Sequence, residues 1–170
     1  MKQTDQTHEF SPSVSWQIIG LFIWVLVCFG CAGIGSAATV SQLEVWYASL
    51  NKPSWNPPNW IFGPVWTTLF AMMAVAAWLV WRSAGFTKGR LSLSWFGIQL
   101  MLNLGWSILF FGCQRPGFAV IEIVLLWLAI AITISLFHRH SKLAAGLMVP
   151  YLCWVSFATV LNLVIWSLNR

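Results

Sequence analysis

Charge is the property that this sequence has least of. Only 8% of its 170 residues are Asp, Glu, Lys or Arg, and just four of these are acidic, whereas 59% are hydrophobic. A soluble domain carries more charge and has no use for so much apolar surface. The nine basic residues are not interleaved with aromatics on a polar segment, so we expect no nucleic-acid partner.

Catalytic and metal-binding motifs are also missing. Cys28-x-x-Cys31 resembles half of a metal or redox site, but no second pair and no nearby His completes it. We therefore interpret the two cysteines as packing residues within a helix. No nucleophile–base pair and no nucleotide-binding loop is found, which argues against dedicated catalysis. The first apolar run is too long for a secretory signal peptide.

Five long apolar runs occupy most of the chain. A helix crosses a bilayer with about 20 apolar residues, and helices satisfy their own backbone amides in hydrocarbon. The sequence therefore predicts an all-α integral membrane protein, with a polar tail over 1–15 and one five-helix membrane domain over 16–170. The expected spans are 16–40, 61–81, 91–113, 117–137 and 143–168.

The distribution of Lys and Arg predicts the orientation. With five spans, one face receives six cations and the other only Lys52, Arg115 and Arg170. Cytoplasmic loops carry the excess of Lys and Arg, so the N-terminus is expected inside and the C-terminus outside. The six inner cations are Lys2, Arg82, Lys88, Arg90, Arg139 and Lys142.

The loop between the first two runs is unusually rich in Trp and Pro. Leu43, Trp46, Tyr47 and Leu50 recur at helical spacing, which predicts a short helix at the membrane surface. Prolines then force a stiff, extended return into the second span. A plain connector needs no such residues, so we interpret the loop as a gate over a binding site. Its gate residues are Pro53, Trp55, Pro57 and Pro58.

Three segments resemble the TspO/MBR family of tryptophan-rich sensory proteins and translocator proteins. The first is Trp46-Tyr47, followed by Lys52-Pro53-Ser54-Trp55-Asn56-Pro57-Pro58 and Gly63-Pro64-Val65-Trp66. The second is Leu102-Asn103-Leu104-Gly105-Trp106-Ser107 with Phe110-Phe111. The third is Pro150-Tyr151 with Trp154, Phe157-Ala158-Thr159, Leu161-Asn162 and Trp166. The likeness covers about residues 16–168.

This resemblance implies a five-helix bundle, commonly a homodimer, in a bacterial membrane, with the inner membrane favoured over the outer. It implies a pocket among the helices, closed by the first loop, that binds porphyrin or haem in a regulatory role and needs no obligatory cofactor. Two alternatives stay open. One is light- and oxygen-dependent porphyrin breakdown, and the other is transport of porphyrins or small apolar ligands.

Porphyrin chemistry and family position together select the candidate site. A broad apolar ring needs stacking faces, an apolar slot and a few donors at a wet rim. Trp66, Trp106 and Trp154 come from three spans, and Trp106 is as readily explained by packing. The remaining candidates are Trp46, Tyr47, Phe62, Asn103, Phe118, Glu122 and Ala158.

Several polar residues have competing interpretations. Glu122 is the only carboxylate within a span, so it is a functional candidate by default, but it is equally explained as a partner of Arg115 or of a Trp N–H. Asn162 is expected to be an interhelical clamp. Leu163 and Ser167 stand where the family's sterol-linked segment has Tyr and Arg, which argues against sterol binding. His8, His138 and His140 all fall on the predicted inner face, so we expect no His ligand to a haem iron and no metal site.

Overall fold

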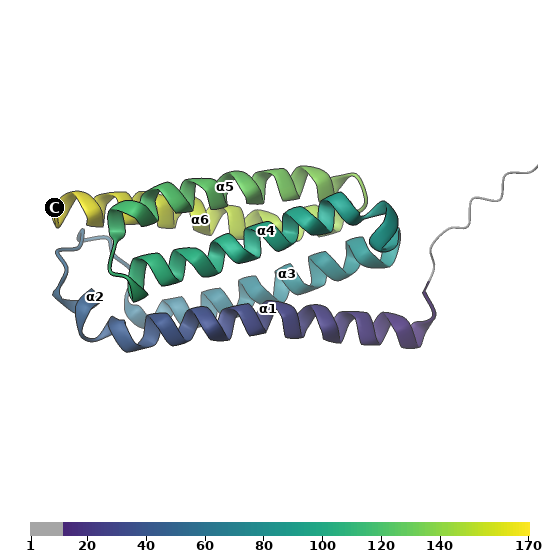
Figure 1. The fold of residues 1–170 in the computed structure, drawn as a ribbon, viewed down its shortest axis with the longest axis horizontal. Coiled ribbons are helices and arrows are strands. Elements are labelled where there is room, and N and C mark those ends of the chain that lie inside the picture. Colours follow the sequence, from purple (N-terminus) through teal and green to yellow (C-terminus); the bar gives the residue numbers. More distant parts are fainter. Residues whose placement is uncertain (1–11) are drawn as a thin grey trace, which may run out of the picture.

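Long helices lying side by side make up most of the described part of the chain. The structure is a computed structural model that describes residues 12–170. Figure 1 shows the chain passing back and forth along one axis, with α2 and the C-terminus at the same end. The elements are α1 (Val14–Leu43), α2 (Trp46–Ser49), α3 (Asn59–Lys88), α4 (Arg90–Ser107), η1 (Ile108–Gly112), α5 (Pro116–His138) and α6 (Lys142–Leu168).

Five of these segments are long and apolar enough to cross a membrane, which confirms the expected five-helix bundle. They are α1, α3, α4 continued by η1, α5 and α6. The predicted second span of 61–81 is the least accurate boundary, because α3 continues to Lys88. A charged residue marks the limit of hydrocarbon and not the end of a helix. The tail expected over 1–15 falls largely on residues 1–11, which lie outside the described residues, and α1 begins at Val14.

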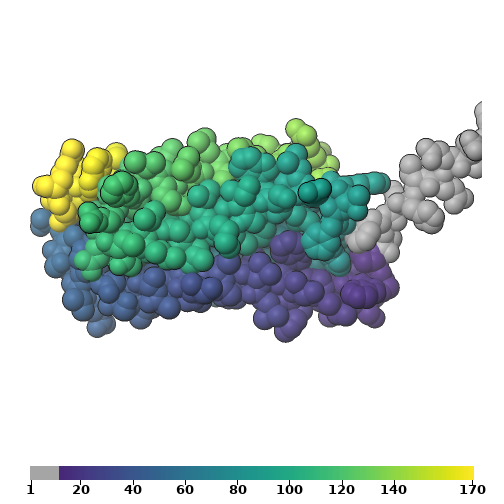
Figure 2. Space-filling model, viewed as in Figure 1, coloured from purple at the N-terminus to yellow at the C-terminus, as the bar shows by residue number. Residues whose placement is uncertain are grey.

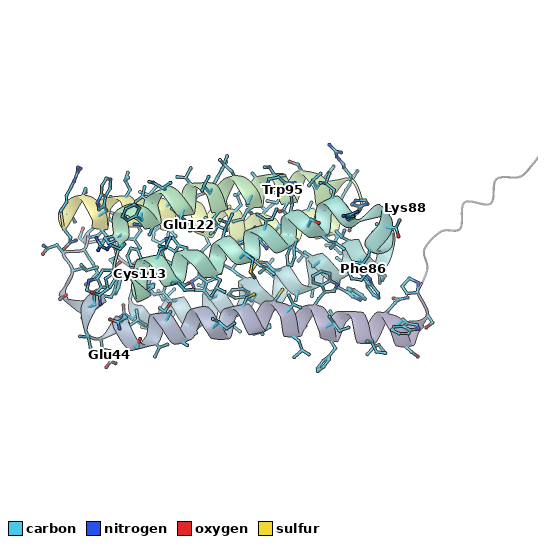
Figure 3. All side chains as sticks on the ribbon, viewed as in Figure 1. Glu44, Phe86, Lys88, Trp95, Cys113 and Glu122 are labelled. Atoms are coloured by element: carbon cyan, nitrogen blue, oxygen red, sulfur yellow. The ribbon has the colours of Figure 1, made fainter. Side chains whose placement is uncertain are left out.

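The two ends of the bundle differ in character. We call the end that carries α2 the lid end, and the opposite end, where α3 turns into α4 and α5 into α6, the base end (Figure 1). Figure 3 shows Phe86 and Lys88 at the base end and Glu44 and Cys113 at the lid end. Which end faces the cytoplasm stays a prediction from the cation count.

The turn between α3 and α4 depends on glycine. Gly85 has φ 61° and ψ −170°, a left-handed region that side chains with a Cβ rarely adopt. Its carbonyl oxygen accepts a hydrogen bond from the Gly89 amide at 3.3 Å. A Cβ on Gly89 would lie 2.6 Å from that same oxygen, so both positions need glycine.

The base half of the bundle is filled by aromatic rings and small side chains. Phe96 and Phe137 are fully buried and stacked, with centroids 5.8 Å apart, and Trp24 meets Phe96 edge-on at 5.7 Å. Alanines on α3 let the neighbouring helices approach closely. Figure 2 shows α1 and α4 in continuous contact along the visible face.

A π-helical segment, η1, connects α4 to the lid end. The Cys113 amide donates to the Ile108 carbonyl at 2.7 Å, and the Arg115 amide donates to the Leu109 carbonyl at 3.0 Å. These wider turns hold more residues than an α-turn, and π-segments are frequent at functional sites. Here the result is that two consecutive residues, Phe110 and Phe111, are both buried.

Candidate functional site

A cavity of about 560 Å³ lies in the lid half of the bundle. Its walls come from α1, α3, α4, η1 and α6, and Tyr47 of α2 closes the end. The expected site residues among its lining are Tyr47, Phe62, Trp66, Asn103, Trp106, Trp154 and Ala158. The structure therefore brings most of the candidates from distant parts of the sequence to one space.

Four tryptophans line this cavity: Trp60 at the start of α3, and Trp66, Trp106 and Trp154 from three different helices. Trp66 lies edge-on to Tyr151 with centroids 6.1 Å apart, and Phe62 lies edge-on to Trp154 at 6.0 Å. Trp106 stacks on Phe110 at 5.2 Å. Each of these three indoles also meets a second ring, which is Phe70, Phe157 or Phe111, so the walls present aromatic surface whose position is set by packing.

The polar groups of the lining are largely satisfied within the bundle. The Asn103 Nδ2 donates to the Tyr151 hydroxyl at 3.0 Å. The Asn162 Oδ1 accepts from Trp106 Nε1 at 3.0 Å, and its Nδ2 donates to the Pro116 carbonyl at 3.0 Å. Asn162 therefore links α4, α5 and α6, and this confirms its interpretation as a clamp.

The lid, defined here as residues 46–58, begins with the short helix that the sequence predicted. Tyr47 is 3% exposed, and its hydroxyl donates to Asn56 Oδ1 at 2.8 Å. Burial raises the pKa of Tyr47, although the hydrogen bond with Asn56 acts in the opposite direction. The hydroxyl thus stays a donor at neutral pH and ties the two halves of the lid together.

Lys52 fixes the end of the lid helix. Its ammonium donates to the carbonyls of Tyr47, Ala48 and Leu50, at 2.6, 3.2 and 3.0 Å, and lies 4.8 Å from the Tyr47 ring centroid. A cation at a helix C-terminus neutralises carbonyls that have no intrahelical partner.

The return segment of the lid is held at both sides. Trp55 meets Phe157 of α6 edge-on at 5.9 Å, and the Asn56 amide donates to the Pro53 carbonyl at 3.0 Å. The Asn169 side chain accepts from the Asn51 amide and donates to the Asn51 carbonyl, both at 2.9 Å. Pro53, Pro57 and Pro58 do not line the cavity but limit the backbone of this segment.

Two aromatic candidates do not line the cavity. Trp46 packs against Phe110 and Phe111, at 5.5 and 6.4 Å, and so supports the lid from outside the cavity. Phe118 is 63% exposed. The buried face of α5 runs through Ala119, Glu122, Ile123 and Leu126, at helical spacing, and Phe118 lies off that face.

Glu122 lies inside the bundle but outside the cavity lining (Figure 3). It is 9% exposed, and neither carboxyl oxygen has a hydrogen-bond partner within residues 12–170. A Cβ on Gly105 would lie 3.6 Å from Oε1, so the carboxyl group faces α4 where that helix has no side chain. Neither Arg115 nor a Trp N–H is its partner in the described chain.

Sequence reasoning missed the wall that α1 contributes. Ser36, Thr39 and Val40 line the cavity, and so does Gly33. The available signal was the change along the first apolar run from large side chains to Gly, Ser, Ala and Thr. Phe110 and Phe157 were also missed as lining residues, although both lie in the segments that carry the resemblance.

The described histidines are far from the cavity. His138 ends α5 at the base end, and His140 Nε2 lies 3.1 Å from Ser92 Oγ. Within residues 12–170, no group of three or more His, Cys, Asp or Glu side chains could hold a metal ion. His8 lies outside the described residues.

Comparison with known proteins identifies the family. The sequence profile of the TspO/MBR family matches residues 23–167. The chain belongs to the TspO/MBR family. It is 48% identical over 155 residues to the tryptophan-rich protein TspO of Chlorobaculum tepidum, covering 90% of this chain and 98% of that protein.

More distant TspO/MBR relatives include a eukaryotic protein. The chain is 44% identical over 143 residues to the translocator protein of Homo sapiens, covering 83% of this chain and 84% of that one. It is 38% identical over 149 residues to the tryptophan-rich sensory protein of Cereibacter sphaeroides, covering 86% of this chain and 92% of that protein. Bacterial relatives and five apolar helices make this a multi-pass bacterial membrane protein.

Proposed function

We propose that this TspO/MBR protein binds a tetrapyrrole, a porphyrin or haem, among its helices under the lid and serves as a membrane sensor or regulator. The observation that carries the proposal is the convergence of Trp66, Trp106 and Trp154, from three helices, on one cavity beneath Tyr47. Indole faces suit a flat conjugated ring better than aliphatic walls do, because offset stacking adds to area burial.

The size and polarity of the cavity support the same ligand class. A volume of about 560 Å³ falls within the range of roughly 300–1,000 Å³ that small-molecule sites occupy. Within residues 12–170 the lining carries no Lys, Arg, Asp or Glu, so the apolar ring belongs inside. Polar Asn59, at the start of α3, borders the cavity, and the ligand's carboxylates would reach water there.

The positions of the histidines define how haem would be held. Among the described residues no His lines the cavity, so an iron porphyrin would be bound through its ring and edge and not through an imidazole ligand. Metal-free porphyrin fits the same description. A homodimer, as the family resemblance implies, is part of the proposal and is testable by crosslinking in native membranes.

A second candidate function is light- and oxygen-dependent breakdown of the bound porphyrin. Trp66 and Trp154 both border the cavity, so an excited ring would lie beside two oxidisable indoles. Transport of porphyrin has less support, because the sequence contains no internal repeat and a single carboxylate within its spans.

Porphyrin titration with matched tryptophan variants tests the binding proposal. Trp154→Ala should weaken affinity about fivefold or more, which corresponds to roughly 1 kcal/mol. Trp95→Ala removes an equal side chain that does not line the cavity, so it should bind like the parent. Equal quenching of Trp fluorescence in both variants would reject the site. A new protein-dependent product under illumination would favour the breakdown activity over sensing alone.

The lid has its own test. Replacing residues 51–59 by a Gly/Ser linker of equal length removes its prolines and aromatic ring and raises the entropy lost on closure. We expect porphyrin release to accelerate more than capture slows in stopped-flow measurements. Equal release rates in parent and variant would show that the loop is only a connector.

A further inference from the structure

Helices α1 and α3 pack tightly in the base half. Gly20 of α1 lies directly against the ring of Trp81, so close that a Cβ would overlap it. Trp78 Nε1 donates to the Gln17 carbonyl at 2.9 Å. Near mid-length, the rings of Phe29 and Phe70 still meet, with centroids 6.5 Å apart.

The same two helices leave a gap in the lid half. Gly33 on α1 and Gly63 on α3 are both exposed, and both line the cavity. A Cβ added at either position would meet nothing within 4 Å. These two positions therefore have one side toward the cavity and one side toward the exterior, with no side chain between.

The register of the helices puts the two glycines at one opening. The helices run antiparallel, and Phe29 faces Phe70, so Gly33 lies about one turn nearer the lid, beside Thr67. Gly63 lies about one further turn toward the lid, opposite Ser36. Ser36 and Thr67 also line the cavity and are also exposed. The opening thus extends over about two turns above the Phe29–Phe70 contact.

The rim of this opening suits contact with hydrocarbon. Both helices are membrane spans, so the gap faces acyl chains and not water. The Thr67 hydroxyl donates to the Gly63 carbonyl at 2.9 Å, and the Thr39 hydroxyl donates to the Gly35 carbonyl at 2.9 Å. These hydroxyl donors are satisfied within their own helices. Contact with a lipid or with an apolar ligand therefore leaves no unpaired hydroxyl donor and costs little free energy.

The water-facing end is held together by more contacts, although Asn59 at the start of α3 is an exposed lining residue there. Tyr47 is nearly fully buried at the top of the cavity, and three backbone carbonyls and the Tyr47 ring hold Lys52 in place. Asn169 ties Asn51 to the end of α6. A ligand approaching from water would have to break several of these contacts, whereas the side facing the bilayer has no such closure.

We propose that the ligand reaches the cavity from within the bilayer, through the opening between α1 and α3 at Gly33 and Gly63. The identity of the ligand as a tetrapyrrole rests on the proposed function, but the route does not. The class of ligand that this route admits is flat, apolar and partitioned into lipid. Water-soluble molecules of equal size are excluded by the lid.

A pair of leucines at the opening tests the route. Leu is a good helix former, and neither glycine has a neighbour that a Cβ would strike, so Gly33→Leu/Gly63→Leu should fold. Gly30→Leu is the matched control, because Gly30 is also exposed and uncrowded on α1 but does not line the cavity. Helical content and thermal stability should match in all three proteins.

Protoporphyrin loaded into vesicles provides the first measurement. In the leucine pair, association and release should both slow by about tenfold or more, while the control keeps the parental rates. Parental association rates in the leucine pair would overturn the route. A change in affinity with unchanged association would show only that the glycines contact the bound ligand, and this too would overturn the route.

Cysteine labelling tests the route without any porphyrin. Ala158→Cys places a thiol in the cavity wall on α6, away from α1, in a background with the four native cysteines replaced by alanine. Lipid-dissolved pyrene maleimide should label it, and the leucine pair should slow this labelling by about tenfold, whereas Gly30→Leu should not. Undiminished labelling rejects the route. If the leucine pair slows the labelling as expected but the parent protein does not bind protoporphyrin, the route stands and the proposed ligand is rejected instead.

Discussion

The base half and the lid half of this bundle use aromatic residues for opposite purposes. In the base half, Phe96 and Phe137 stack and exclude space, and Gly20 lets Trp81 press against α1. In the lid half, Trp66 and Trp154 each pack against two neighbouring rings and still border the cavity. The same five helices therefore form a close-packed support at one end and a cavity at the other.

This difference shows how a small membrane protein can keep a cavity without collapsing around it. A hollow costs packing energy, because the atoms that line it lack neighbours. In the lid half, the lid contacts and the hydrogen bonds of the Asn162 clamp hold the helices in place around the cavity and offset this loss. The dense half supplies stability, and the hollow half supplies the surface that we propose binds the ligand.

The largest expected effect comes from removing a ring that fills the base half. Phe96→Ala should lower the free energy of unfolding by about 3–5 kcal/mol, because it opens a cavity in a packed region. Phe62→Ala, which enlarges a cavity that already exists, should cost about 1 kcal/mol. Equilibrium unfolding in mixed micelles, followed by circular dichroism, measures both. Equal losses would mean that the two halves do not differ in packing.

The tie between the lid and the C-terminal helix should have a smaller effect, confined to the lid half. Asn169→Ala removes the pair of hydrogen bonds with Asn51 and one with the Ile165 carbonyl at 2.7 Å. A closed lid weakened by about 1 kcal/mol should open about fivefold more often, which adds a route to water beside the route through the bilayer, so porphyrin release should accelerate by up to about fivefold. Gln114→Ala breaks an exposed bond to Gln42 at the same end and serves as the control. Unchanged release in Asn169→Ala would assign no role to the tie.

Alkaline pH should loosen the lid through Tyr47. Burial raises the pKa of Tyr47, so the closed lid favours the neutral phenol, although the hydrogen bond with Asn56 acts in the opposite direction. Stability of the closed lid is full below the ordinary tyrosine pKa of about 10 and falls as the pH rises beyond it. Porphyrin release should then accelerate in the parent. The Tyr47→Phe variant keeps Lys52 but lacks the titrating phenol. The rate of porphyrin release from this variant should therefore change less than that of the parent over the same pH interval.

The smallest expected effect comes from the histidines of the base end. His138→Ala and His140→Ala lie far from the cavity, so the visible spectrum of bound haem should not change. A spectrum typical of two-His ligation that disappears in either variant would mean that haem binds at the base end. That result would reverse the roles assigned to the two halves.

The gross architecture could be predicted from sequence because a bilayer leaves few choices. Twenty apolar residues without charge must form a helix, and five such runs must form a bundle. The short helix at Trp46 was predicted from its periodicity and is present. Boundaries were predicted less well, since α3 continues past Arg82 to the glycine turn.

The candidate site was predicted in part. Trp66, Trp106 and Trp154 were selected by residue type and family position, and the structure places them in one cavity. Phe118 and Trp46 were selected by the same reasoning but lie outside it. A difference of one residue turns a side chain by about 100° around a helix, and this rotation depends on which face the neighbouring helices cover.

The sequence by itself determined the membrane location, the number of spans, the stiff lid and the family, because these depend on local composition and on residues close together in the chain. Only the tertiary structure decided which helix faces converge. It placed Glu122 against Gly105 and not in the cavity, and it left Gly33 of α1 and Gly63 of α3 both exposed and in the cavity lining. Such outcomes depend on the shapes of residues far apart in sequence, and hydrophobic periodicity carries no information about them.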